Sequence, residues 1–229
     1  MVIAGFQNLS LIDYPGKCCS IVFTQGCVFR CPYCHNPELI STRPTTTISE
    51  ESVLKYLVDN KKMLDGVCIT GGEPTIQVGL RRFIEQVKEI GMSVKLDTNG
   101  VHPDLVQELL DAKLIDYLAM DLKHRWEKYE TVARSGGSKT VEHCQRTFSI
   151  IQNSGIDHEF RTTVFPGGHT EEDFIEMVSY LKDGEKYFIQ DTQFTKTLEK
   201  EMVQTKDFEV KELLEKLRVT YPNITIEMR

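Results

Sequence analysis

Short apolar runs rich in β-branched residues alternate with amphipathic stretches along this chain, and this alternation restricts the fold more than any other feature of the sequence. A strand periodicity that repeatedly gives way to a helical one predicts parallel strands joined by right-handed helical crossovers. We expect strands at residues 19–24, 67–70, 93–97, 117–121, 159–165 and 187–190. We expect helices at residues 49–64, 77–90, from 103 onward, 141–154, 171–181 and 208–219.

About six β/α units result, so the chain is expected to be an α/β protein. Periodicity alone admits an open or partly closed barrel as well as a doubly wound sheet. Residues 135–138 are expected to form a loop between two helices. Residues 223–228 are expected to end the chain in a strand that closes the sheet or docks a partner.

The composition is that of an ordinary globular protein, because 229 residues with 40% hydrophobic and 27% charged side chains suit one domain spanning the chain. A net charge of −7 gives no broad attraction to phosphate backbones, so no nucleic-acid partner is expected. No apolar run approaches the roughly 20 residues of a membrane span, and no export signal is seen at the start. The odd number of cysteines, 7, argues against a disulfide framework and for a reducing, cytoplasmic location.

Three cysteines follow the first expected strand in the pattern CxxxCxxC, at Cys27, Cys31 and Cys34. Cys31 and Cys34 also match a redox CPYC motif, and with His35 a CxxCH haem-attachment site. The redox motif does not require Cys27, and covalent haem attachment normally implies export, for which no signal is seen. Structural zinc is a third alternative, although adjacent Cys34 and His35 cannot easily face one tetrahedral ion. Three thiolates from one tight loop suit a cubane iron–sulfur cluster that leaves one iron open. The remaining cysteines, which we expect to be small buried hydrophobes, are Cys18, Cys19, Cys68 and Cys144.

Three further polar segments follow the next three expected strands. The first contains Gly71, Gly72 and Glu73, and the others are residues 96–100, Leu-Asp-Thr-Asn-Gly, and 120–123, Met-Asp-Leu-Lys. Because the carboxyl ends of parallel strands meet at one edge of a sheet, these segments and the cysteines are expected to form one site.

At these segments the chain resembles the radical S-adenosylmethionine (SAM) superfamily, whose cysteine motif has an aromatic residue before its last cysteine, here Tyr33. The resemblance implies a partial (β/α)6 TIM-like barrel of the radical SAM type over residues 1–229, with 1–17 as an N-terminal extension and about 191–229 closing or flanking the barrel. It also implies a [4Fe-4S] cluster on the three cysteines, with SAM bound at the open iron.

The resemblance further implies roles for individual residues. The Gly71 to Glu73 segment would bind the methionyl amino group, and Lys123 would pair with the SAM carboxylate. Asp97, Thr98, Met120 and Asp121 would help to hold a monovalent cation. The residues implied around the cosubstrate are Tyr33, His35, Gly71, Gly72, Glu73, Asp97, Thr98, Asn99, Asp121, Lys123, Arg161 and Val164.

Residues 96–100 and 120–123 resemble segments of the glycyl-radical activating enzymes, and residues 5–17 and 34–38 resemble the activating proteins of anaerobic ribonucleoside-triphosphate reductase. The implied partners are that reductase, which would receive a glycyl radical, and a flavodoxin- or ferredoxin-like electron donor. Arg161 and Val164 would reach the nucleoside part of SAM. His124 and His169 are instead expected at the surface.

Two alternatives stay open at this point. A radical SAM enzyme similar to 7-carboxy-7-deazaguanine synthase would keep the cluster and act on a small molecule. A metal-binding or electron-transfer module would keep a metal and never cleave SAM, although Gly71 to Glu73 argue against this interpretation.

Overall fold

The computed structural model describes residues 1–44, 46–201 and 208–229. Eight strands in these residues form one sheet whose spatial order follows the chain, from β1 to β8. β1 runs antiparallel to β2, whereas each later neighbouring pair is parallel. The strands are β1 (Ile3–Ser10), β2 (Cys19–Thr24), β3 (Gly66–Gly71), β4 (Ser93–Thr98), β5 (Tyr117–Asp121), β6 (Asp157–Thr163), β7 (Lys186–Gln190) and β8 (Thr225–Met228).

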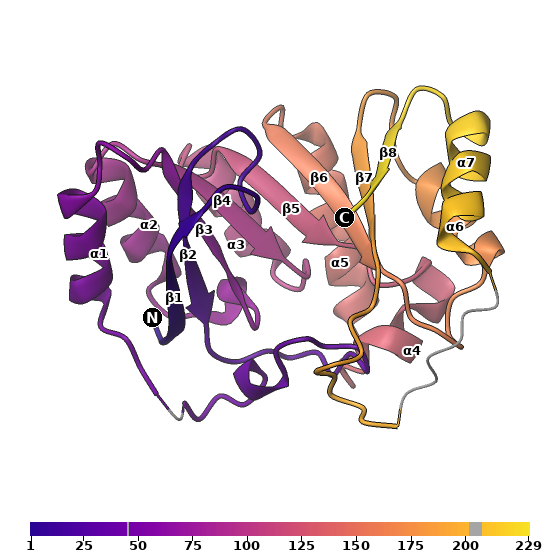
Figure 1. Ribbon diagram of the computed structural model, residues 1–229, viewed down its shortest axis with the longest axis horizontal. Helices are drawn as coiled ribbons and strands as arrows, with labels where there is room; N and C mark the ends of the chain where they lie inside the picture. Colours follow the sequence, from indigo (N-terminus) through magenta and orange to yellow (C-terminus); the bar gives the residue numbers. More distant parts are fainter. Residues whose placement is uncertain (45, 202–207) are drawn as a thin grey trace.

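The helices form the outer layer of the molecule, and the inner face of the curved sheet is open toward the viewer in Figure 1. The α-helices are α1 (Glu50–Asp59), α2 (Leu80–Glu89), α3 (Pro103–Asp111), α4 (Tyr129–Ala133), α5 (Thr140–Asn153), α6 (Glu171–Ser179) and α7 (Val210–Thr220). Short 3-10 helices are η1 (Pro37–Leu39), η2 (Pro74–Ile76) and η3 (Trp126–Lys128). Helical crossovers between parallel strands produce this layering.

α2 illustrates why the outer helices stay on the sheet. Its buried side chains are Leu80, Phe83, Ile84 and Val87, which lie on one face of a helix at intervals of three and four residues. Each such side chain contributes about 1.5–3 kcal/mol when it is removed from water. The helix begins after Gly79, whose φ of 90° is in the left-handed region, and it therefore starts three residues later than the sequence suggests.

The predicted α/β fold of partial-barrel type is confirmed, and the sheet is open, with β1 and β8 as its two edges. β8 extends the sheet beside β7 and does not close it. β1 was not expected, because residues 1–17 were interpreted as an extension. Only its two end residues are buried, so the strand lacks the continuous apolar run that marks the central strands.

Other boundaries differ modestly from the expectation. α1 ends at Asp59, five residues before the expected end at Leu64, and the side chain of Asn60 donates a hydrogen bond to the carbonyl of Tyr56 beyond its last turn. Residues 135–138 connect α4 and α5, as expected. In the ranges that the structure describes, no helix combines the length and apolarity needed to cross a bilayer.

Candidate functional site

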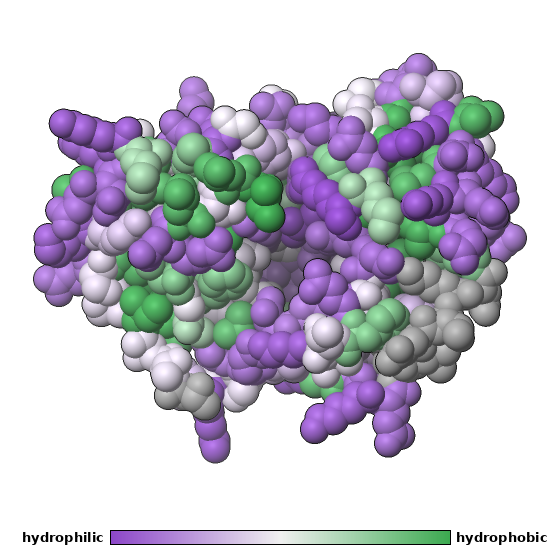
Figure 2. Space-filling model, in the orientation of Figure 1, coloured by the Kyte–Doolittle hydropathy of each residue, from purple (hydrophilic) through white to green (hydrophobic). Residues whose placement is uncertain are grey.

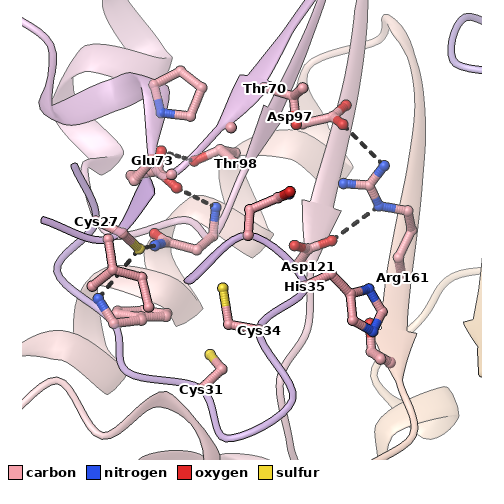
Figure 3. A pocket seen from close by; sticks show the side chains of 18 of the residues that line it. Cys27, Cys31, Cys34, His35, Thr70, Glu73, Asp97, Thr98, Asp121 and Arg161 are labelled. Carbon is pink, nitrogen blue, oxygen red and sulfur yellow. Dashed lines mark hydrogen bonds and ion pairs between the residues drawn. The ribbon is translucent and has the colours of Figure 1, made fainter. Parts of the chain in front are cut away.

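A cavity of about 390 Å³ lies on the inner side of the sheet, and the expected site segments meet in it. Figure 3 shows the three cysteines of the motif along one side, with Glu73 and the Asp97, Asp121 and Arg161 group around them. The expected residues that line this cavity are Cys27, Cys31, Tyr33, Cys34, His35, Gly71, Gly72, Glu73, Asp97, Thr98, Asn99, Asp121, Lys123 and Arg161. Four strand ends therefore contribute to one site, as the strand-end rule predicts.

The cysteine loop is held by backbone hydrogen bonds from its own flanks. Cys27 N–H donates to the carbonyl of Ile40 at 3.1 Å, and Cys34 N–H donates to the carbonyl of Cys31 at 3.0 Å. Arg30 N–H donates to the carbonyl of Ala133 at the end of α4, at 2.8 Å. The spacing of the three thiols is thus fixed by turns and by packing against two neighbouring segments.

The three thiols suit a cluster better than a single ion. Among the described residues, no three His, Cys, Asp or Glu side chains converge closely enough to hold one metal ion. A cubane cluster does not need that convergence, because each thiolate binds a different iron. Burial raises the pKa of Cys27 to about 12 and that of Cys31 to about 11, so cluster binding must release protons.

The Gly71 and Gly72 turn fits against the chain that leads into the cysteine loop. A Cβ on Gly72 would lie 2.1 Å from the carbonyl oxygen of Gly26, and one on Gly71 would lie 2.3 Å from the nitrogen of Thr24. Gly72 N–H donates to the Thr24 carbonyl at 2.9 Å, and Glu73 N–H donates to the Gly26 carbonyl at 2.8 Å. The two glycines therefore allow β2 and β3 to place the cysteine loop and Glu73 side by side.

The carboxylate of Glu73 is buried and already accepts four hydrogen bonds. Its Oε1 accepts from Thr75 N–H at 3.1 Å, from the Thr75 hydroxyl at 2.6 Å and from the Thr98 hydroxyl at 2.7 Å. Its Oε2 accepts from Asn99 N–H at 2.7 Å. Burial raises the pKa of Glu73, and these donors oppose that rise. The carboxylate thus ties the end of β3 to the end of β4 and keeps acceptor capacity on Oε2.

A chain of opposite charges crosses the inner face of the sheet (Figure 3). The Arg161 guanidinium lies between Asp97 and Asp121, at 3.1 and 2.9 Å. Asp121 also binds Lys123 at 2.9 Å, and Asp97 also pairs with buried Lys95. Burial alone would raise the pKa of Asp121, but Lys123 and Arg161 hold this pKa well below its usual range. Burial would likewise raise the pKa of Asp97, but Arg161 and Lys95 lower it, so both carboxylates are ionised at neutral pH.

Tyr33 carries a polar atom without a protein partner. Its buried hydroxyl has no hydrogen bond within the described part of the chain, and its ring lies 5.9 Å from the Lys123 ammonium. The ring also contacts Phe165 at a centroid distance of 6.0 Å. A buried unsatisfied hydroxyl in a cavity beside three thiols suits a site built for a bound group.

Two expectations about individual residues were wrong. His124 and His169 were expected at the surface, yet they are 0% and 1% exposed. Their rings lie 4.6 Å apart between the loops that follow β5 and β6, where each ring bonds to backbone groups. Among the other cysteines, Cys19, Cys68 and Cys144 are buried as expected, whereas Cys18 is only partly buried.

Val164 is completely buried and is not among the residues that line the cavity. Met120 is likewise buried and is not among the lining residues. Conversely, sequence reasoning missed several lining residues. Thr163 and Gln190 are the last residues of β6 and β7, and Thr70 is the last but one of β3, so the strand-end rule could have predicted all three. The other unexpected lining residues are Asp13, Phe23, Phe29, Asn36, Ile40 and Pro74.

An open α/β barrel with three cysteines in the first βα loop defines a radical SAM enzyme. In agreement, residues 21–181 match the family model of the radical SAM superfamily. A protein of Methanocaldococcus jannaschii assigned to the glycyl-radical enzyme activating enzymes is 34% identical over 194 residues, which cover 82% of this chain and 79% of that protein. The pyruvate formate-lyase 1-activating enzyme of Escherichia coli K12 is 27% identical over 180 residues, covering 75% of this chain and 70% of that enzyme.

Among solved structures, SuiB of Streptococcus suis bound to SAM superposes with a TM-score of 0.70 at 15% identity, over 91% of this chain. The superposed region is 49% of SuiB, so this chain spans about half of that protein and the likeness concerns the fold. The chain belongs to the glycyl-radical activating enzymes of the radical SAM superfamily. This membership implies a [4Fe-4S] cluster, SAM and a glycyl-radical enzyme as partner.

Proposed function

We propose that this enzyme generates the glycyl radical of an anaerobic ribonucleoside-triphosphate reductase. The observation that carries the proposal is the meeting of the three cysteines, the Gly71 to Glu73 turn and Lys123 in one cavity. The choice of reductase rests on residues 5–17 and 34–38, which resemble the activating proteins of that enzyme.

Cys27, Cys31 and Cys34 would hold the cluster. When bound and reduced, such a cluster supplies the one electron that opens SAM to methionine and a 5′-deoxyadenosyl radical. The enzyme's own contribution is to orient SAM and to exclude water. A hydrogen atom from the glycine Cα of the reductase then converts the nucleoside radical to 5′-deoxyadenosine and leaves the radical on glycine.

Lys123 would receive the SAM carboxylate. Its ammonium has three N–H donors, and within the described ranges one of them is engaged by Asp121, which leaves two for a ligand. The remaining acceptor capacity on Glu73 Oε2 suits the methionyl ammonium group. The hydroxyl of Tyr33, which lacks a protein partner among the described residues, is available to the same ligand.

The remaining roles are proposals of the same kind. Asp97, Thr98, Met120 and Asp121 would surround a monovalent cation, and Arg161 would hold the two carboxylates of that group in place. Arg161, His35 and Asn99, which line the cavity, would shape the space around the nucleoside. Val164 is buried and does not line the cavity, so this role does not extend to it. A flavodoxin- or ferredoxin-like protein would deliver the electron, because the cluster must reach the low end of the range of potentials.

The test is anaerobic reconstitution with iron and sulfide, reduction with dithionite, and addition of SAM and the reductase. We expect about four irons per chain, formation of 5′-deoxyadenosine and a glycyl radical signal in electron paramagnetic resonance. Cys31→Ala should lose iron and both products. Cys19→Ala is the matched control, since this thiol is also buried and does not line the cavity. Iron binding without 5′-deoxyadenosine would refute the proposal.

A further inference from the structure

The end of β1 and the connection that leads to β2 carry a group of exposed aliphatic side chains. Leu9, Leu11 and Ile12 are 40%, 69% and 82% exposed. We call these three residues the apolar tip. Isolated exposed aliphatic residues are common, but three within four positions form a patch of the kind that marks interaction sites.

The apolar tip is held on a rigid turn. Ser10 Oγ accepts hydrogen bonds from the N–H groups of Ile12 and Asp13, at 3.2 and 3.3 Å, and its hydroxyl donates to the Asp13 carboxylate. Tyr14 is 2% exposed and packs against the ring of Tyr117 with a centroid distance of 5.9 Å. The Ser10 hydrogen bonds and the packing of Tyr14 therefore fix the turn, and Leu11 and Ile12, its two most exposed side chains, face solvent.

The apolar tip borders the cavity of the candidate site. Asp13, the next residue, lines the same cavity as the three cysteines. In Figure 1 the indigo connection between β1 and β2 is a loop at the upper end of these strands, at the edge of the open side of the sheet. Figure 2 shows a central hollow in this face, with hydrophobic surface on the rim beside that connection. The tip therefore lies beside the hollow, next to a residue that lines the cavity.

We propose that the apolar tip is a docking surface for the glycyl-radical reductase, which it contacts through Leu11 and Ile12. This inference rests on the proposed function. The atom to be attacked there is a backbone Cα, so a folded protein must bring part of its main chain into the cavity. The protein around that segment then covers the rim, and the rim beside Asp13 is apolar. Burying the tip also removes water from the mouth of the site.

The test compares Leu11→Asp/Ile12→Asp with Val219→Asp in the reconstituted full-length enzyme. Val219 is 83% exposed on α7 and serves as the matched control for placing an acidic group on an exposed aliphatic position. Three quantities are measured: bound iron, 5′-deoxyadenosine formed without reductase, and the reductase concentration that gives half-maximal glycyl radical. A second variant, Leu11→Lys/Ile12→Lys, separates apolar contact from charge.

For both double variants we expect unchanged iron and unchanged 5′-deoxyadenosine without reductase. The half-saturating reductase concentration should rise about 10- to 100-fold, as for other interface anchors, and Val219→Asp should leave it unchanged. A short peptide carrying the target glycine should be attacked equally by all variants, because it does not need the rim.

If all variants need the same reductase concentration for half-maximal glycyl radical, the docking proposal is wrong and the proposed function still stands. Tighter saturation with the lysine variant would show an electrostatic contact and would overturn it as well. A wild-type dimer that dissociates in both double variants would mean that a second copy covers the tip. If the wild-type enzyme forms 5′-deoxyadenosine but no radical on the reductase, the proposed partner is wrong and the docking proposal falls with it.

Discussion

Glu73 and Asn99 are joined by a hydrogen bond of 2.7 Å from the backbone N–H of Asn99 to Oε2 of the Glu73 carboxylate. The bond connects the turn after β3 with the segment after β4. It brings two strand ends into contact through a side chain that is 1% exposed. Glu73 therefore builds the site in addition to any contact with a ligand.

Glu73→Gln should weaken SAM binding at least tenfold while the iron content stays unchanged. An amide has one oxygen where the carboxylate has two, so one of the four donors to Glu73 would lose its acceptor, at a cost of about 1–3 kcal/mol. SAM affinity is measured by equilibrium binding to the reconstituted enzyme. Glu85→Gln, a change at an exposed ion pair, is the control. Loss of iron in Glu73→Gln would show that the residue supports the cysteine loop instead.

Gly72→Ala should disturb the cysteine loop. The added methyl group would lie 2.1 Å from a backbone oxygen of Gly26, which has no flexible side chain to move aside. We expect a loss of about 1–3 kcal/mol in the free energy of unfolding, together with reduced iron binding. Both are measured by denaturant unfolding and iron analysis.

Gly136→Ala provides the comparison for that substitution. Gly136 has a φ of +68°, and no atom lies within 4 Å of the position that a Cβ would take, so the change costs only backbone strain of about 1–2 kcal/mol. Iron binding should be unaffected there. Equal iron binding in the two alanine variants would mean that the Gly26 contact is unimportant for the loop.

Arg161→Lys should destabilise the protein by about 1–3 kcal/mol. One ammonium cannot reproduce the planar guanidinium that joins Asp97 and Asp121, so one of these carboxylates loses its partner. Unfolding in denaturant measures the effect. The control is Arg81→Lys, because Arg81 forms exposed ion pairs with Glu85 and Glu108. Normal stability with weakened SAM binding would instead support a role for Arg161 at the nucleoside.

His169 should make the protein less stable as the pH falls. Burial lowers the pKa of His169 to about 3, from an ordinary value of 6.5, and neighbouring His124 adds to the effect. Below pH 6.5 the unfolded chain therefore takes up a proton that the folded chain refuses. The free energy of unfolding should fall by up to about 1.4 kcal/mol per pH unit in this range. His169→Gln should flatten the dependence measured between pH 5.5 and 7.5.

His158 has the opposite sign and provides the control. Burial would lower its pKa, but the hydrogen bond to Glu185 raises that pKa above the ordinary value. Its contribution to stability is present below pH 6.5 and is lost as the pH rises through the raised pKa. In His158→Gln the free energy of unfolding should therefore no longer contain the decrease that the wild type shows as the pH rises through the pKa of His158. Equal slopes in wild type and His169→Gln would contradict the role assigned to the buried imidazole.

The strands and the site segments could be predicted because their signals are local. A buried parallel strand is a continuous apolar run, and a glycine-rich or acidic segment directly after it is visible in the sequence. β1 lacks such a run and was missed. The four donors to Glu73 could not be predicted, since two of them come from Thr98 and Asn99, about 25 positions further along the chain.

The two buried histidines show a related limit. His124 and His169 stand in polar loops, where a histidine is usually exposed. Their burial depends on the contact between two loops 45 residues apart in the sequence. Asp13 was missed for the same reason, because only the curvature of the sheet brings the β1–β2 connection to the cavity. Tertiary contacts of this kind do not produce a hydrophobic periodicity that can be recognised in the sequence.

The order of the sheet has a consequence for how the enzyme is made. Each strand pairs with the one that precedes it in the chain, so an emerging polypeptide can add strands one at a time without waiting for a distant partner. The contacts of Gly72 and Glu73 with Thr24 and Gly26 can form once the chain through Glu73 has left the ribosome. The cysteine loop can thus acquire its framework during translation, while Asp97, Asp121, Lys123 and Arg161 of the cavity lining are still to be synthesised.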